Sequence, residues 1–143
     1  MTRTLQSTGS SVIPTLRYRD VKAAIKWLKS AFGFLPHLVV PDENGAVTHA
    51  QLTCGNGMIM LGAVRDDAFG KLTRQPSDAG GSTQSPYIIV QDVDAHHARA
   101  VAAGAKIMSP VREEPYGGSA YSCCDPERHL WNFGSYDPWA ARS

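Results

Sequence analysis

The sequence predicts an α+β fold made of two copies of one βαβββ module. A helical segment between an aspartate and a glycine occurs twice, from Asp20 to Gly33 and from Asp92 to Gly104. The two aspartates lie 72 positions apart in a chain of 143 residues. The pattern of strands around each segment is also the same. Such a period indicates two copies of a module rather than a solenoid, and a pocket can form where two halves meet.

In the first module, alternating apolar residues predict a strand over 11–18, which Pro14 weakens or places at a sheet edge. Asp20 is suited to cap the following helix, because its side chain can accept from the free amides of the first turn. Gly33 is suited to the left-handed position that ends a helix. Further strands are predicted over 34–40, 47–53 and 58–61, with turns at 41–45 and 54–57.

The second module repeats this order. A strand over 85–90 precedes the helix that Asp92 begins, and strands over 105–108, 116–124 and 130–133 follow. The stretch 65–82 lacks periodicity and contains Gly80-Gly81, which is typical of a long connection. The predicted organisation is a flexible N-terminal segment (1–10), a first module (11–64), a linker (65–84), a second module (85–136) and a C-terminal tail (137–143).

Composition excludes several classes of partner. The net charge is +1, and the 14 basic and 13 acidic residues are not clustered, so neither nucleic acid nor an anionic membrane is expected to bind. No apolar run is long enough to span a bilayer, and no signal peptide is recognisable. The three cysteines are odd in number and two are adjacent. This argues against a disulfide framework and predicts a cytoplasmic protein.

Short motifs in both halves resemble the vicinal oxygen chelate superfamily, which includes glyoxalase I, bleomycin-resistance proteins and extradiol dioxygenases. In the second half they are VQDVDAH at 90–96, AGAK at 103–106, PYG at 115–117 and DPERHLW at 125–131. In the first half HAQL at 49–52 precedes GNG at 55–57. The resemblance covers Val12 to Tyr136, and it implies a curved mixed sheet around a cavity.

Enzymes of that superfamily hold a divalent metal with His, Glu or Gln side chains, one on each of four strands. The pattern places these positions at Ile13, Gln51, Ser85 (or the neighbouring Pro86) and Asn132. Only Gln51 is a ligand of the usual kind, because Ile13 has no donor atom and neutral hydroxyl or amide oxygens hold such metals weakly. We therefore expect no metal and no other cofactor in this chain.

The expected ligand is a small molecule in the cavity, uncharged or weakly polar, unless Arg17 also turns inward. His49 is either a polar contact or general base, or a strand histidine bonded to its neighbour, which is favoured. Tyr116 belongs to a glycine-rich loop that is either a lid or a simple turn. Strand alternation from the four positions, together with this loop, predicts as ligand-binding residues Ile13, Thr15, His49, Gln51, Ser85, Tyr87, Tyr116 and Asn132.

Three functions remain open. The first is a metal-free protein that binds a small, partly aromatic molecule, as bleomycin-resistance proteins do. The second is a glyoxalase-like or dioxygenase-like enzyme with a rearranged metal site that uses His49 and Gln51. The third is a metal-independent enzyme that uses His49 or Tyr116. A symmetric homodimer is expected in each case. Cys123 and Cys124 are interpreted as small buried hydrophobes, and Arg128 as a residue with a strained turn conformation.

Overall fold

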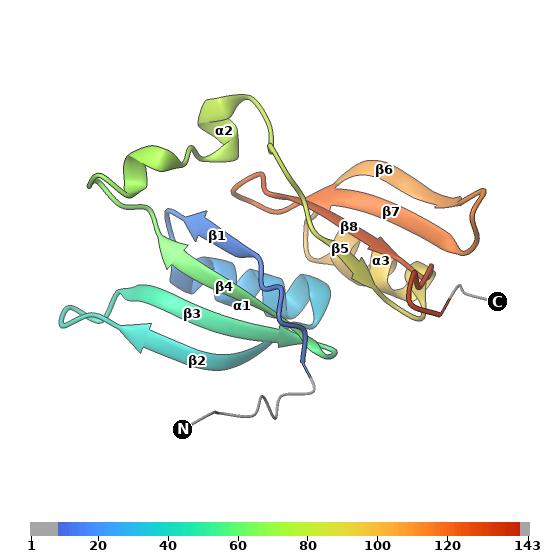
Figure 1. The fold of residues 1–143 in the computed structure, drawn as a ribbon, viewed down its shortest axis with the longest axis horizontal. Coiled ribbons are helices and arrows are strands. Elements are labelled where there is room, and N and C mark those ends of the chain that lie inside the picture. The colour runs from blue at the N-terminus through green and yellow to red at the C-terminus, as the bar shows by residue number, and fades with distance from the viewer. Residues whose placement is uncertain (1–8, 141–143) are drawn as a thin grey trace, which may run out of the picture. The chain divides into compact units, whose positions relative to one another are not determined.

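The structure is a computed structural model that describes residues 9–140, which form two compact units (Figure 1). Of the described residues, unit 1 contains 9–29 and 33–64, and unit 2 contains 30–32 and 65–140. Each unit contains one four-stranded mixed sheet with the βαβββ order, so the predicted α+β fold is confirmed. Residues 1–8 of the predicted N-terminal segment and 141–143 of the predicted tail lie outside the described residues.

The sheet of unit 1 has the strand order β1-β4-β3-β2. Strand β1 runs parallel to β4, and the other neighbours are antiparallel. The first strand is shorter than predicted, because Pro14 has no N–H for the ladder, although its carbonyl still accepts from Met60 N at 3.0 Å. The elements are β1 (Thr15–Tyr18), α1 (Val21–Phe32), β2 (Leu35–Pro41), β3 (Val47–Cys54) and β4 (Gly57–Ala63).

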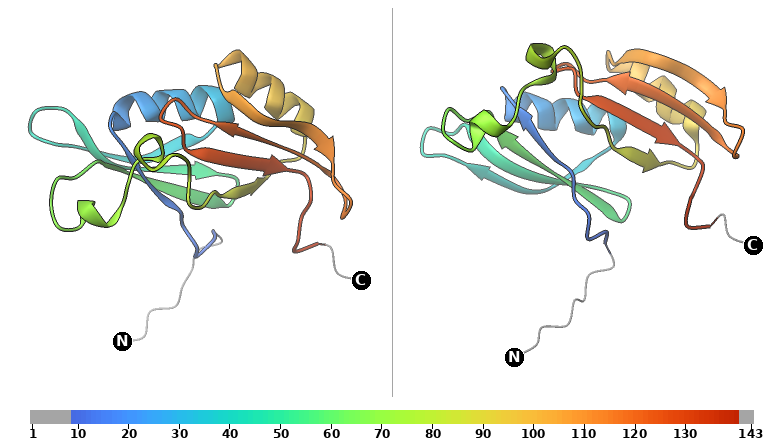
Figure 2. Two further views of the ribbon diagram at one scale, coloured as in Figure 1. Left: turned by 90° about the horizontal axis from the view of Figure 1, so that it is seen from above. Right: turned by 45° about the horizontal axis from the view of Figure 1, so that its top comes forward.

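Helix α1 begins and ends where the sequence predicts. The Asp20 side chain accepts from Ala23 N at 3.0 Å, and Gly33 ends the helix in the left-handed conformation at φ 75°. Figure 2 shows α1 along one face of the first sheet. This helix face of the sheet forms the core of unit 1, with the buried side chains of Val21, Ala24, Leu28, Ala50, Leu52, Ile59 and Leu61.

The sheet of unit 2 has the corresponding order β5-β8-β7-β6. Two short helical segments precede it that the sequence did not predict, because three or four residues are too few to establish a helical period. Strand β6 is longer than predicted and contains β-bulges opposite β7. The elements are η1 (Gly70–Leu72), α2 (Pro76–Ala79), β5 (Tyr87–Ile89), α3 (Val93–Ala102), β6 (Lys106–Glu113), β7 (Ser119–Cys124) and β8 (Leu130–Gly134).

An aromatic core fills the helix face of the second sheet. Helix α3, which Asp92 caps by accepting from Ala95 N at 3.0 Å, packs on β6 and β7. The Phe32 ring, from the α1 turn that belongs to unit 2, lies 4.6 Å from the Phe133 ring and 5.5 Å from the Trp131 ring. Tyr121, Trp131 and Phe133 are fully buried. The two faces of the second sheet therefore differ at β7 and β8. Aromatic side chains fill the face toward α3, and the other face, which carries Ser122 and Asn132, is called the open face.

A buried carboxylate organises the turn between β7 and β8. Asp125 Oδ1 accepts from Glu127 N and His129 N, both at 3.0 Å, and Oδ2 accepts from the Trp131 indole at 3.0 Å. Arg128 adopts φ 70°, which agrees with its predicted strained conformation. These contacts fix the start of β8 and therefore the positions of the side chains that follow on its open face. Among residues 9–140, no helix is long and apolar enough to cross a membrane.

Candidate functional site on the open faces of the two sheets

The open face of unit 1 contains two rows of side chains that run across all four strands. In strand pairing, residues that face each other project to the same side of the sheet. Paired positions across β1, β4, β3 and β2 give one row of Thr15, Met60, Gln51 and Leu38, and a second row of Arg17, Gly62, His49 and Val40. Gln51 and His49 are half-buried, and Thr15 is exposed. Ile13 is half-buried and lies before β1.

His49 and Gln51 contact each other along β3. Their Nε2 atoms are 3.2 Å apart, a distance at which the amide donates to the ring nitrogen when the imidazole carries its proton on Nδ1. The residue that orients His49 is therefore a neutral amide, which does not stabilise an imidazolium as a carboxylate does. This geometry resembles a polar recognition pair more than a general base with its orienting acid.

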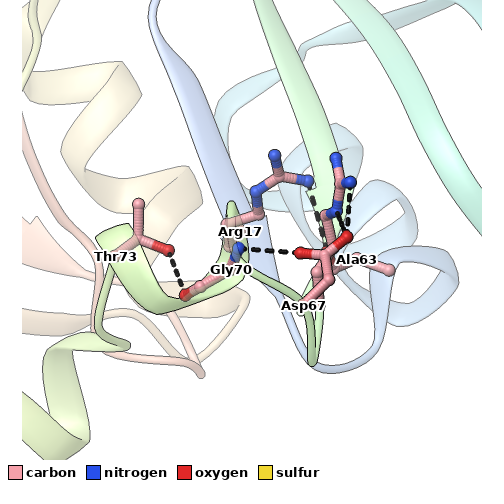
Figure 3. Close-up of polar contacts among 6 residues, drawn as sticks. Arg17, Ala63, Asp67, Gly70 and Thr73 are labelled. Carbon is pink, nitrogen blue, oxygen red and sulfur yellow. Dashed lines mark hydrogen bonds and ion pairs between the residues drawn. The ribbon is translucent and has the colours of Figure 1, made fainter.

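Arg17 turns onto the same open face. Its guanidinium lies across Gly62, where a Cβ atom would overlap Nη1, and Nη1 donates to the Ala63 carbonyl at 3.3 Å (Figure 3). The missing side chain at Gly62 therefore gives the guanidinium its place beside the sheet. The open face of unit 1 thus carries a positive charge in the same row as His49.

In unit 2, Asn132 is the centre of a polar network on the open face. Its Oδ1 accepts from Ser122 Oγ at 2.7 Å, and its Nδ2 donates to Ser85 Oγ at 2.7 Å and to the Pro86 carbonyl at 3.0 Å. Both amide hydrogens are used, so the orientation of the Asn132 side chain is fixed. Tyr87 lies opposite Asn132 in the register of β5 and β8. The structure thus brings three predicted site residues together, Ser85, Tyr87 and Asn132.

The remaining predicted residue of this unit, Tyr116, lies in the loop between β6 and β7. Its ring packs edge-on against Tyr136, with centroids 4.8 Å apart, and Tyr136 accepts from the Tyr87 hydroxyl through its backbone carbonyl at 2.8 Å. Sequence reasoning missed Tyr136, because it follows the last strand in a stretch with no periodicity. Ser122 was also missed, since a serine inside a strand gives no signal of a specific contact.

The four positions that the resemblance suggests for a metal do not form a suitable donor set. Ile13 has no donor atom, and Ser85 and Asn132 already bond to each other. Met60 of the first module occupies the position that Asn132 occupies in the second. The backbone amide of Met60 donates to the Pro14 carbonyl and that of Asn132 to the Pro86 carbonyl. Met60 and Asn132 lie 72 positions apart, as do Pro14 and Pro86. A thioether therefore stands at this repeated position in unit 1, and an amide in unit 2. Among residues 9–140, no group of three or more His, Cys, Asp or Glu side chains is arranged to hold a metal ion.

Other candidate reactive groups are structural. Burial raises the pKa of Cys123 to about 12 and also raises the pKa values of Cys54 and Cys124, so none is an activated thiol. Burial and the nearby Arg99 lower the pKa of His96 to about 4. Its ring stacks on Phe32, and its Nδ1 is 2.6 Å from the Tyr121 hydroxyl, so it is a neutral part of the core of unit 2.

Comparison with known proteins gives several relatives. TioX from Micromonospora sp. ML1 is 35% identical, with a TM-score of 0.71 over 88% of this chain and 98% of that chain. An uncharacterised protein of Mycobacterium bovis is 29% identical over 121 residues, which are 85% of this chain and 80% of the relative. The fosfomycin resistance protein FosX from Listeria monocytogenes, solved with Mn(II) and 1S,2S-dihydroxypropylphosphonic acid, shares the fold. It is 17% identical, with a TM-score of 0.65 over 92% of each chain.

The family itself follows from the sequence match. Residues 11–133 match the sequence model of a single family, and this stretch includes both sheets apart from the last residue of β8. The match agrees with the repeated βαβββ order and with the fold of TioX. This chain belongs to the Glyoxalase/Bleomycin resistance protein/Dioxygenase superfamily.

Proposed function

We propose that this protein binds a small, partly aromatic molecule without a metal, through side chains on the open faces of its sheets. The observation that carries this proposal is the network around Asn132. At a position where the superfamily resemblance suggests a metal ligand, this chain has a neutral amide that is already bonded to Ser122, Ser85 and the Pro86 carbonyl. Such a group is suited to hold neighbouring hydroxyls in place for recognition.

The chemistry of the candidate residues supports recognition of an aromatic ligand. Tyr87 and Tyr116 are 40% and 56% exposed, so both offer aromatic surface to a ligand. In unit 1, the amide of Gln51 and the imidazole of His49 offer polar contacts, and Met60 offers an adaptable apolar one. Aromatic surface beside a few fixed polar groups is typical of small-molecule sites.

One observation favours an enzymatic alternative. His49 and Gln51 are neighbours on one strand, and both residue types occur as metal ligands in the superfamily resemblance. A rearranged metal site would need further ligands, and a metal-independent reaction would use His49 or Tyr116 for proton transfer. Elemental analysis of protein purified without chelator decides between metal-free binding and a rearranged metal site. One equivalent of zinc, nickel, iron or manganese per chain would contradict the metal-free proposal.

The binding proposal is tested by a thermal-shift screen of planar aromatic compounds, glutathione conjugates and catechols. A ligand at 100 times its dissociation constant stabilises the fold by about 2.7 kcal/mol, which is a melting shift of several degrees. We expect planar aromatic compounds to give such shifts. We expect Asn132→Leu and Gln51→Leu to reduce the ligand-induced shift, which is read instead of the absolute melting temperature because Asn132 also supports the sheet.

A matched control is Thr48→Val on β3. Thr48 is an exposed residue beside His49, at a register irregularity in the pairing of β2 with β3, and its hydroxyl donates to the Val40 carbonyl, so its replacement should leave the ligand-induced shift unchanged. If the compounds shift wild type and both open-face variants equally, the assigned residues do not contact the ligand. If no aromatic compound shifts the wild type, the ligand class is wrong.

We further propose that the protein is a homodimer in the cytoplasm. Strand β2 is the edge of its sheet, and Leu35, Leu38 and Val39 on it are 58%, 46% and 40% exposed. Apolar side chains on an open edge favour pairing with another chain. The three cysteines are free thiols, as expected in a reducing compartment. Light scattering coupled to gel filtration should give twice the 15.4 kDa chain mass, and a monomer at micromolar concentration would contradict the dimer.

A further inference from the structure

Two glycines of unit 2 allow Tyr87 to reach the backbone of Tyr136, and Tyr116 to pack on the ring of Tyr136, at one end of the open face. The first is Gly134, the last residue of β8, over which the Tyr87 ring lies. A Cβ at Gly134 would be 2.5 Å from the Tyr87 hydroxyl oxygen and 2.9 Å from Cε1, so any side chain there would displace the ring. With the ring in this place, the Tyr87 hydroxyl donates to the Tyr136 carbonyl at 2.8 Å.

The second is Gly118, in the loop between β6 and β7. A Cβ there would be 2.6 Å from Ser135 Oγ and 2.9 Å from Tyr136 N, so only glycine allows this close approach. The loop is closed by bonds from Glu114 N to the Gly118 carbonyl and from Gly117 N to the Glu114 carbonyl, at 2.8 and 3.0 Å. This closed loop holds Tyr116 against Tyr136, with ring centroids 4.8 Å apart at an interplanar angle of 74°.

The electrostatic surroundings of these rings are negative. The pKa of Tyr87 is raised by burial first, and then by the proximity of Tyr116, Glu114 and Asp137. Both acidic side chains are therefore close enough to act on the phenol. The faces of aromatic rings are also electronegative, so the charge and the rings favour the same sign of ligand.

The guanidinium nearest to Glu114 is already engaged. Arg112 Nε lies 2.8 Å from Glu114 Oε1, and Arg112 Nη1 donates to Ser109 Oγ at 2.6 Å. Glu114 Oε1 is buried and has no partner in hydrogen-bond geometry. Among residues 9–140, the charged side chains that act on the Tyr87 phenol, Glu114 and Asp137, are both acidic, which disfavours a carboxylate or phosphate ligand.

We propose that the tyrosine corner, formed by Tyr87, Tyr116 and Tyr136, binds a substituted ammonium group of the ligand through cation–π contacts. Aromatic rings around a quaternary or alkylated ammonium are a common mode of recognition for such cations. Partial exposure of Tyr87 and Tyr116 leaves ring surface available to a ligand. This inference rests on the proposed binding function and narrows its ligand class to aromatic compounds with an amine.

The experiment compares choline with 3,3-dimethylbutan-1-ol, a neutral molecule of the same shape. Protein with ¹³C-labelled tyrosine rings is titrated with each compound and followed by NMR. The chain has five tyrosines, and Tyr18 and Tyr121 are 2% and 0% exposed, so they serve as internal references. We expect choline to shift the signals of the three corner tyrosines and leave the two references unchanged, while the neutral compound has little effect.

Variants of Tyr116 separate ring chemistry from shape. Tyr116→Phe keeps the aromatic face and should bind choline as wild type does, whereas Tyr116→Leu should weaken binding roughly 2- to 30-fold. Phe69→Leu, at an exposed aromatic residue elsewhere in unit 2, is the matched control and should have no effect. Glu114→Gln should also weaken choline binding but not the binding of the neutral compound.

Several results would overturn the proposal: equal binding of the neutral compound, wild-type affinity in Tyr116→Leu, or no shift at the corner tyrosines. Failure here is distinguishable from failure of the proposed function. If choline has no effect but aromatic compounds still raise the melting temperature through Asn132 and Gln51, the binding function stands without the ammonium site. If choline binds at the corner but no aromatic compound gives a shift, the ammonium site stands and the aromatic ligand class fails.

Discussion

Replacement of Asp125 by asparagine tests how the β7–β8 turn positions the open face of unit 2. In the wild type, Asp125 is 4% exposed, and its carboxylate accepts from the backbone amides of Glu127 and His129 and from Trp131 Nε1. An asparagine can keep its oxygen toward the amides of Glu127 and His129, but its NH₂ group then faces the indole N–H. The flipped amide is no better, because the NH₂ group would then face both backbone donors.

The magnitude follows from the lost bond and the donor conflict. A hydrogen bond to a charged group contributes about 1.5–3 kcal/mol, and a buried donor without an acceptor costs about 1–3 kcal/mol. With partial relief by local movement, Asp125→Asn should lower the free energy of unfolding by about 2–4 kcal/mol. The matched control is Asp42→Asn, since exposed Asp42 uses only Oδ1, toward Asn44 N and Ala46 N, and asparagine preserves both bonds. It should change the free energy of unfolding by less than about 0.5 kcal/mol.

A double-mutant cycle with Trp131→Phe isolates the donor conflict. Phenylalanine has no N–H at this position, so in its background Asp125→Asn should cost about 1.5–3 kcal/mol less than in the wild type. Urea unfolding is followed by far-UV circular dichroism, because the tryptophan substitution removes a fluorophore. Additivity of the two substitutions within about 0.5 kcal/mol would show that the Asp125–Trp131 contact is not the cause, and would refute the reasoning.

Three further predictions concern pH, the η1 segment and the thiols. The pKa of His96 is lowered to about 4 in the fold, so the unfolded chain binds a proton first as the pH falls from 6.5 to 4, and the stability falls with it. Because the ring is partly exposed, we expect a loss of about 1–2 kcal/mol between pH 7.5 and 4.5 that is smaller in His96→Gln, and equal losses in urea titrations would contradict this. At Gly70, a Cβ would overlap the backbone carbonyl of Arg65, so Gly70→Ala should lower the melting temperature by several degrees in calorimetry, and an unchanged value would contradict this. Since the pKa values of Cys123 and Cys124 are raised, the native thiols should react with a disulfide reagent at pH 8 at least about ten-fold more slowly than in urea. A similar rate in both states would assign an open, reactive thiol.

The features that the sequence predicts well are local. The aspartate caps at Asp20 and Asp92 each satisfy an amide three residues ahead, so their geometry depends only on the adjacent helix. The left-handed Gly33 and Arg128 are likewise decided by their own backbone. The start of β1 was less well predicted, because Pro14 has an alternating pattern around it but no N–H to contribute to the ladder.

The candidate site was only partly predictable, because its contacts join residues far apart in the chain. Alternation correctly puts His49 and Gln51 on one face of β3, and it puts Tyr87 opposite Asn132 only once the pairing register is known. The Ser122–Asn132 bond and the approach of Tyr116 to Tyr136 depend on that register and on the path of loops. No periodicity in the sequence encodes either feature.

The two modules have a glycine at the same position, but a different side chain lies across it in each. Gly62 and Gly134 lie 72 positions apart, each on the last strand of its module beside the first strand. In unit 1 a guanidinium, from Arg17, lies across the glycine, whereas in unit 2 a phenol, from Tyr87, does so.

A side-chain-free position next to the first strand therefore leaves room for one long residue to lie flat on the open face. The identity of that residue then sets the charge of the face. Unit 1 presents the Arg17 guanidinium in the same row as His49, and unit 2 presents aromatic rings close to Glu114 and Asp137. The two open faces therefore differ in charge, although each has its glycine at the same position of the repeat.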